Sequence, residues 1–183
     1  KTDAAGLRDF CAGTEAIFCK PAGLCGGEGI QRLVTADIQD YDKLYQQLVQ
    51  GGQLLIEEPI RQHPDMCRLC PDSVNTVRIV TLVTERGAQM VYALVRMGMG
   101  GVCVDNVSSG GMYAPVNEQG QLYRPAFCDK TGKYYERHPV TGTDIVGFQI
   151  PLFDQALALC RTASKRVEEH LKYIGWDVAI TPD

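Results

Sequence analysis

The chain has 183 residues, of which 45% are hydrophobic and 22% charged, a balance typical of globular proteins and unlike disordered, collagen-like or coiled-coil chains. Its 18 lysines and arginines against 22 aspartates and glutamates give a net charge of −4, which argues against a general affinity for nucleic acid or acidic lipid. No apolar run approaches the roughly 20 residues of a membrane-spanning helix, so we expect no membrane insertion.

The first 60 residues are predicted to form a small α+β lobe. The pattern favours a helix over the first dozen residues, a strand over 16–20, a glycine-rich turn over 23–29 and a strand over 30–34. Asp40 is a suitable N-cap for a helix that continues to about Val49 and ends at Gly51. A third strand is expected over 53–58, with residues 54–56 as its buried part and Pro59 as its stop.

Residues 61–183 are predicted to form a larger lobe. An irregular connection over 61–74 leads to an antiparallel hairpin made by 76–84 and 90–96, and short strands and turns follow over 115–150. From Asp154 an apolar stripe at three- and four-residue spacing extends to Ile174 and predicts an amphipathic helix leading into a strand over 175–181. The closing Pro182 and Asp183 are typical of a turn, so we expect the natural protein to continue.

Cysteine usage points to a reducing compartment, and we expect a cytoplasmic protein. Eight cysteines are spread over the chain, and several lie in apolar or helical runs where a thiol behaves as a small hydrophobe: Cys19, Cys103, Cys128 and Cys160. Cys67 and Cys70 have the spacing of half a zinc site. Neither His63 nor His138 belongs to a second pair with that spacing, so the sequence favours structural thiols.

The glycine-rich turn is the first candidate binding feature. Gly26, Gly27 and Gly29 can present successive backbone N–H groups to one anion, and Lys20 at the end of the preceding strand adds a point charge. Such an arrangement suits a phosphate chain, although a plain hairpin turn with a solvated lysine has the same pattern. The segment Glu57-Glu58-Pro59-Ile60 is a second candidate, because a strand end leaves backbone groups free for an adenine edge. Acidic residues there can equally be solvated.

Two arginines and one aspartate interrupt apolar strands. Arg78 lies within the first hairpin strand and Arg96 at the end of the second, so their guanidinium groups can share a face. Such charges need an anion, which is either a phosphoryl group or substrate carboxylate, or a carboxylate of this chain: Glu57, Glu58, Asp105 or Asp177. Asp177 interrupts the last strand and is therefore a candidate Mg²⁺ ligand or arginine partner.

The order of these phrases resembles a known superfamily. IFCKPAGLCGGEG at 17–29, LIEEPI at 55–60, NTVRIVT at 75–81, RMGMGGVCVDNVSSGG at 96–111 and GWDVAITPD at 175–183 look like the ATP-grasp superfamily. Within it, the phrases QHP at 62–64, DN at 105–106, HP at 138–139 and GWD at 175–177 look most like the sugar-transfer-associated ATP-grasp group, a relative of the alpha-L-glutamate ligases. The resemblance covers nearly all of the chain.

The resemblance implies an α+β ATP-grasp fold whose two lobes, 1–60 and 61–183, clasp ATP with antiparallel sheets. It assigns Lys20 to the α- and β-phosphates, and Gly26, Gly27 and Gly29 to a closing loop. It also assigns residues 57–60 to an adenine hinge, with Glu57 or Glu58 on the ribose and Ile60 at the hinge end. The family's N-terminal subdomain and its Glu-x-Asn metal pair are not found in this sequence, so we expect these 183 residues to be catalytically incomplete by themselves.

For the chemistry, the resemblance assigns Arg78 and Arg96 to the γ-phosphate and acyl phosphate, Asn106 to the substrate end and Asp177 to Mg²⁺. The implied reaction joins a small-molecule carboxylate to an amine through an acyl phosphate, in polysaccharide or cell-envelope biosynthesis. His138 is expected to be structural. The alternatives are a non-catalytic nucleotide-binding regulatory module and a metal-binding interaction domain built on Cys67 and Cys70.

Overall fold

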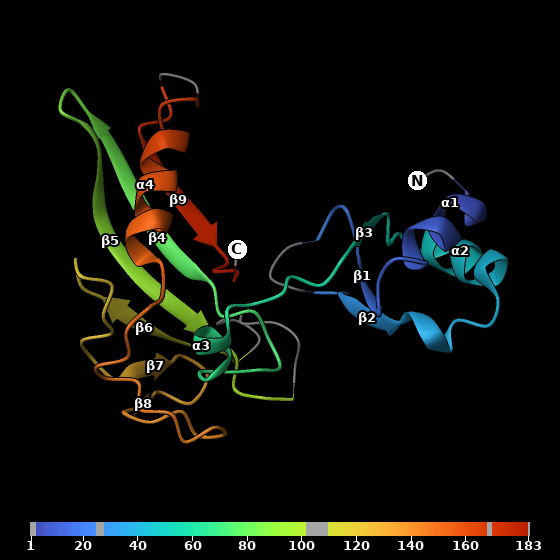
Figure 1. The fold of residues 1–183 in the computed structure, drawn as a ribbon, viewed down its shortest axis with the longest axis horizontal. Helices are drawn as coiled ribbons and strands as arrows, with labels where there is room; N and C mark the ends of the chain where they lie inside the picture. Colours follow the sequence, from blue (N-terminus) through green and yellow to red (C-terminus); the bar gives the residue numbers. More distant parts are fainter. Residues whose placement is uncertain (1–2, 25–27, 102–109, 168–169, 183) are drawn as a thin grey trace. The chain divides into compact units, whose positions relative to one another are not determined.

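The computed structural model describes residues 3–24, 28–101, 110–167 and 170–182. The chain divides into two compact units, Lys1–Ile60 and Arg61–Asp183 (Figure 1). Each unit is a mixture of helices with an antiparallel sheet, so the predicted α+β class is confirmed. No helix in the described part of the chain is long and apolar enough to cross a bilayer.

Unit 1 is a three-stranded antiparallel sheet with strand order β2-β1-β3. Its elements are α1 (Ala4–Cys11), β1 (Ala16–Lys20), β2 (Gln31–Val34), the 3-10 turn η1 (Thr35–Asp37), α2 (Tyr41–Gln50) and β3 (Leu55–Glu57). Both α-helices begin at an aspartate cap: Asp3 accepts a hydrogen bond from the Gly6 amide at 2.7 Å and Asp40 accepts one from the Lys43 amide at 2.9 Å.

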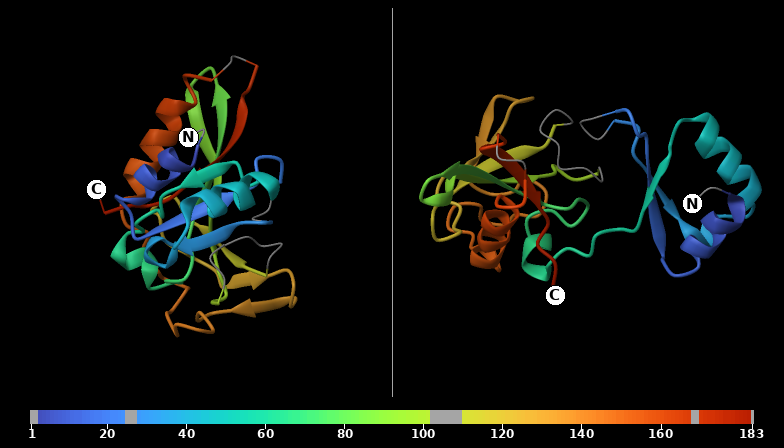
Figure 2. Two further views of the ribbon diagram at one scale, coloured as in Figure 1. Left: turned by 90° about the vertical axis from the view of Figure 1, so that its right-hand side faces the viewer. Right: turned by 90° about the horizontal axis from the view of Figure 1, so that it is seen from above.

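The two helices of unit 1 cover one face of its sheet (Figures 1 and 2). Ile17 and Cys19 of β1 are fully buried beneath them, together with Leu7 and Leu48 of the helices. Because side chains alternate along a strand, Phe18 and Lys20 lie on the other face of the sheet. The unit therefore has one apolar face and one face that presents a cation.

Unit 2 is a six-stranded antiparallel sheet with strand order β8-β7-β6-β5-β4-β9. Its elements are α3 (Pro64–Cys67), β4 (Val77–Thr84), β5 (Gly87–Met97), β6 (Met112–Val116), β7 (Ala126–Cys128), β8 (Lys133–Tyr135), α4 (Phe153–Ala163) and β9 (Tyr173–Val178). The sheet and α4 enclose one core, which includes Val77, Ile79 and Val95 from the two central strands (Figure 1). The alternate positions of these strands lie on the other face of the sheet, which we call the open face.

The structure differs from three sequence expectations. Leu54 and Leu55, predicted to be buried, are 61% and 49% exposed, because β3 is an edge strand in which Ile56 packs on the core. A short helix, α3, occupies the connection predicted to be irregular. The predicted amphipathic helix stops at Ala163, and Ile174 lies in β9, where a six-residue ladder with β4 replaces helical hydrogen bonds.

Two glycines of unit 2 test how tightly the core is packed. Gly120 and Gly147 both have positive φ, 77° and 89°, but an added Cβ at Gly120 comes within 2.6 Å of Phe153, whereas the space at Gly147 is open. We expect Gly147→Ala to lower the free energy of unfolding by about 1 kcal/mol through backbone strain alone. Gly120→Ala is expected to cost about 1–3 kcal/mol more because Phe153 must move. Urea denaturation measures both, and equal losses would contradict this packing.

Candidate functional site

The Lys20 amine of unit 1 is paired with a carboxylate of the neighbouring strand. β1 places Lys20 opposite Leu55 of β3, and the Lys20 amine forms an ion pair with the Glu57 carboxylate. Both side chains are partly exposed, which leaves the amine open to another anion. Glu58 and Ile60 follow β3 in extended, exposed chain, and Ile60 is 52% exposed.

Of the three glycines assigned to the closing loop, Gly29 lies within the described residues, and its position needs a glycine. Its φ is +73°, and a Cβ there would lie 2.8 Å from Cγ of Pro21. The side-chain amide of Gln53 donates to the Gly29 carbonyl at 3.0 Å, so the base of the turn is fastened beside β3. Gly26 and Gly27, the other predicted loop residues, lie outside the described residues.

Arg78, Arg96 and Asp177 form one cluster on the open face of unit 2. The register pairs Arg78 of β4 with Asp177 of β9, and the Arg78 Nε and Nη2 atoms donate to the two carboxylate oxygens at 2.5 and 3.0 Å. Arg96 of β5 reaches the same carboxylate, with Nη2 at 2.9 Å from Oδ1. The three strands thus bring together residues that are up to 99 positions apart.

The cluster is half-buried and strongly oriented. The Arg96 side chain is 17% exposed, and its Nε and Nη2 atoms also donate to the Thr76 hydroxyl at 3.1 and 3.0 Å. The Arg78 side chain lies over Gly175, where an added Cβ would be 3.6 Å from its Cδ and Nη1 atoms. Thr76 is a positioning residue that the sequence analysis missed, although it belongs to the quoted NTVRIVT phrase.

The electrostatics of Asp177 follow from its two partners. Burial raises the pKa of the carboxyl, but the hydrogen bonds and charges of Arg78 and Arg96 outweigh it, so the pKa lies below its ordinary value of 3.8. Of the carboxylates offered as arginine partners, Asp177 therefore takes this place, while Glu57 pairs with Lys20. Asp105 and the predicted substrate residue Asn106 lie outside the described residues.

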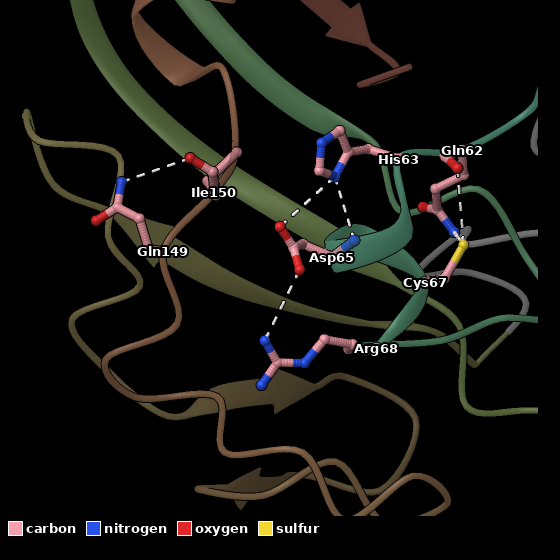
Figure 3. Close-up of polar contacts among 7 residues, drawn as sticks. All are labelled: Gln62, His63, Asp65, Cys67, Arg68, Gln149 and Ile150. Carbon is pink, nitrogen blue, oxygen red and sulfur yellow. Dashed lines mark hydrogen bonds and ion pairs between the residues drawn. The ribbon is translucent and has the colours of Figure 1, made fainter. Parts of the chain in front are cut away.

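The CxxC segment belongs to a hydrogen-bonded network around α3 (Figure 3). Gln62 donates to the Cys67 sulfur at 3.5 Å, as Figure 3 shows. Its side-chain oxygen accepts from the backbone and side-chain amides of Asn75 at 2.6 and 2.8 Å. His63 caps α3 by accepting from the Asp65 amide at 3.1 Å. No group of three metal-ligating side chains occurs within the described residues.

Cys70 and His138 are buried together in unit 2. Burial raises the pKa of the Cys70 thiol, but the polar groups around it, among them His138, Ser73 and backbone amides, outweigh burial and lower the pKa to about 7. The His138 Nδ1 atom accepts two backbone N–H bonds, so Nε2 carries the proton and donates to the Gly98 carbonyl at 2.8 Å. Both ring nitrogens are thus engaged in holding loops.

Two hollows lie away from these charged residues. One of about 220 Å³ in unit 1 is lined largely by apolar side chains, among them Leu7, Phe10 and Tyr45. Another, of about 610 Å³ in unit 2, is lined by polar and charged residues that include Asp65, Arg68 and Asp144. Neither lining includes Lys20, Arg78, Arg96 or Asp177.

The depressed pKa of Asp177 predicts a pH-dependent contribution to stability. The ionised carboxyl stabilises the fold fully above its ordinary value of 3.8, and this contribution is lost as the pH falls through the lower folded-state pKa. We expect Asp177→Asn to lower the unfolding free energy on the order of 1 kcal/mol near neutral pH. The difference from the wild type should vanish in stronger acid. Urea titrations between neutral and acid pH measure it, with Asp9→Asn on the exposed side of α1 as control. A difference independent of pH would contradict the ion-pair assignment.

Comparison with known proteins identifies a family for this chain. A family model described as sugar-transfer associated ATP-grasp matches residues 2–183. No curated protein and no solved structure matches the chain significantly. The resemblance drawn from the sequence phrases is confirmed over nearly the whole chain, and the antiparallel α+β architecture agrees with it. The ATP-grasp superfamily consists typically of ATP-dependent ligases. The chain belongs to the sugar-transfer-associated ATP-grasp family.

Proposed function

We propose that the protein is an ATP-dependent ligase that joins a carboxylate to an amine through an acyl phosphate. The observation that carries the proposal is the cluster of Arg78, Arg96 and Asp177 on one sheet face. Two oriented guanidinium groups match the charge and shape of a transferring phosphoryl group, and a carboxylate between them can turn to a metal ion. The family membership supports the use of ATP.

Lys20 is proposed to bind the α- and β-phosphates, because its amine is a flexible point charge at a strand end beside the glycine-rich turn. Glu57, its partner in the structure, is then released toward the ribose hydroxyl groups. Gly26, Gly27 and Gly29 are proposed to close over the phosphates, with Glu58 and Ile60 beside the adenine. Lys20 would thus exchange the Glu57 carboxylate for phosphate oxygens, and both side chains would remain charged.

The reaction has two steps. In the first, a carboxylate oxygen attacks the γ-phosphorus of ATP, the bond to the β–γ bridging oxygen breaks, and ADP leaves. In the second, the amine nitrogen attacks the acyl carbon, the bond to the phosphate oxygen breaks, and the amine loses a proton as the amide and inorganic phosphate form. Arg78 and Arg96 would hold the phosphoryl oxygens in both steps, with Asn106 near the substrate.

Asp177 is the proposed protein ligand for Mg²⁺. One carboxylate with phosphate oxygens and water is a donor set that Mg²⁺ accepts, so the residues present fit this ion. When bound, the ion supplies charge neutralisation at the β- and γ-phosphate oxygens. Arg78 and Arg96 would then exchange the Asp177 oxygens for those of the phosphate.

A non-catalytic nucleotide-binding module that regulates polysaccharide assembly is the second candidate. The observation that favours it is that both Asp177 oxygens already accept arginine hydrogen bonds. A cluster that is satisfied in this way can stabilise the sheet without any metal. The two candidates differ in whether ADP is released when substrate is present.

ATP with Mg²⁺ is expected to raise the melting temperature of the 183-residue chain, because a ligand that binds the folded state stabilises it. Lys20→Ala and Asp177→Ala should each reduce the rise by at least half, since each removes a phosphate or metal contact. Lys43→Ala, at an exposed lysine of α2, is the matched control and should leave the rise unchanged. Differential scanning fluorimetry measures the melting temperatures. The proposed site would be contradicted if ATP with Mg²⁺ raised the melting temperature of both variants as much as that of the wild type.

Acyl-phosphate chemistry is tested by hydroxylamine trapping. With ATP, Mg²⁺ and a panel of carboxylates, the full-length natural protein should yield hydroxamate and ADP in equal amounts, and Arg96→Gln in that protein should reduce both about 100-fold or more. ATP binding without ADP release for any carboxylate would favour the regulatory module.

A further inference from the structure

A row of aromatic side chains begins beside Arg96 and crosses the open face of unit 2. The strand register places Arg96 of β5 opposite Tyr113 of β6, Tyr113 opposite Phe127 of β7, and Phe127 opposite Tyr134 of β8. These strands are successive neighbours in the sheet (Figure 1). Directly opposite residues lie on the same face, so the three rings continue the line of the arginine cluster.

The rings of this aromatic row touch one another and face away from the core. Tyr113 and Phe127 meet edge to face with centroids 6.0 Å apart, and the centroids of Phe127 and Tyr134 are 4.8 Å apart. The alternate residues of the same strands, Met112, Ala114, Ala126 and Cys128, are the ones buried in the core. Tyr134 is 72% exposed at the far end of the row.

Polar groups accompany the rings. The Tyr113 hydroxyl makes a hydrogen bond with Asp129, and burial together with the nearby Asp129 and Tyr134 groups raises the Tyr113 pKa. Asp129 and Lys130 are exposed in the turn that connects β7 and β8. The aromatic row therefore combines ring surface with phenol and carboxylate groups that can hydrogen-bond hydroxyl groups.

A purely structural role explains only part of the row. Cross-strand aromatic pairs stabilise a sheet, and the contact between Tyr113 and Phe127 is of that kind. A ring that stays 72% exposed, as Tyr134 does, removes little apolar area from water and so adds little to folding. Its position in line with Arg96 is better suited to a ligand.

We propose that the aromatic row binds the organic part of the carboxylate substrate, and that this substrate is a sugar acid of the uronic type. The inference rests on the proposed function, which assigns the acyl phosphate to Arg96. A pyranose ring has a face of C–H bonds that is attracted to the negative face of an aromatic ring, and a rim of hydroxyl groups. The aromatic row would contact the C–H face, its polar neighbours would hydrogen-bond the hydroxyl groups, and Arg96 would bind the carboxylate.

The test is binding of D-glucuronate to the 183-residue chain, measured by saturation-transfer NMR with and without ADP and Mg²⁺. Glucose, which lacks the carboxylate, and benzoate, which lacks the hydroxyl groups, are the comparison probes. Glucuronate is expected to bind more tightly than either. Tyr134→Ala should weaken glucuronate binding about three- to tenfold, the range expected for one aromatic contact.

Two further variants show whether the Tyr134 ring causes the loss of glucuronate affinity. Tyr134→Phe keeps the ring and should retain most of the affinity, and Tyr123→Ala, at a half-exposed tyrosine outside the row, should leave it unchanged. The proposal is overturned if glucuronate does not bind saturably, if benzoate binds more tightly, or if Tyr134→Ala has no effect. The ATP-dependent rise in melting temperature reports separately on the proposed function, so the two can fail independently.

Discussion

The bonds from Arg78 and Arg96 to Asp177 are the interaction on which the functional argument depends. They link three adjacent strands of unit 2, β5, β4 and β9, on the face away from the core. Because the backbone of each strand is fixed by its ladder, the charged groups are held in place before any ligand arrives. Such preorganisation is what phosphoryl transfer requires, since the protein contributes positioning and charge rather than a nucleophile.

The separation of faces is what makes this cluster possible. Apolar side chains of β4, β5 and β6 all enter one core with α4, so the opposite positions are available for arginines and aromatic rings. Unit 1 repeats the principle with α1 and α2 over one face and Lys20 on the other. In each unit the helices and one set of strand positions form the core, and the alternate strand positions carry the charged residues of the proposed site.

Strong local signals made much of the fold predictable. The Asp40 cap, the hairpin of β4 and β5 and the strand at Ala16–Lys20 follow from capping, turn chemistry and apolar runs. The sequence left two roles open for Asp177, Mg²⁺ ligand or arginine partner, because it cannot give the register of β9 on β4. The aromatic row was not predicted, since residues 115–150 lack periodicity and its alignment depends on three separate registers. The end of α4 was missed because the apolar spacing continues by chance into β9.

Gly175 has a kinetic consequence for the cluster. With no side chain at this position, the Arg78 guanidinium rests on bare backbone and is not walled in by a neighbour along β9. Its transfer from Asp177 to an incoming anion needs rotations about single bonds in one side chain and the loss of its two hydrogen bonds to the carboxylate. Anion capture at Arg78 can thus proceed while the backbone of the sheet stays still.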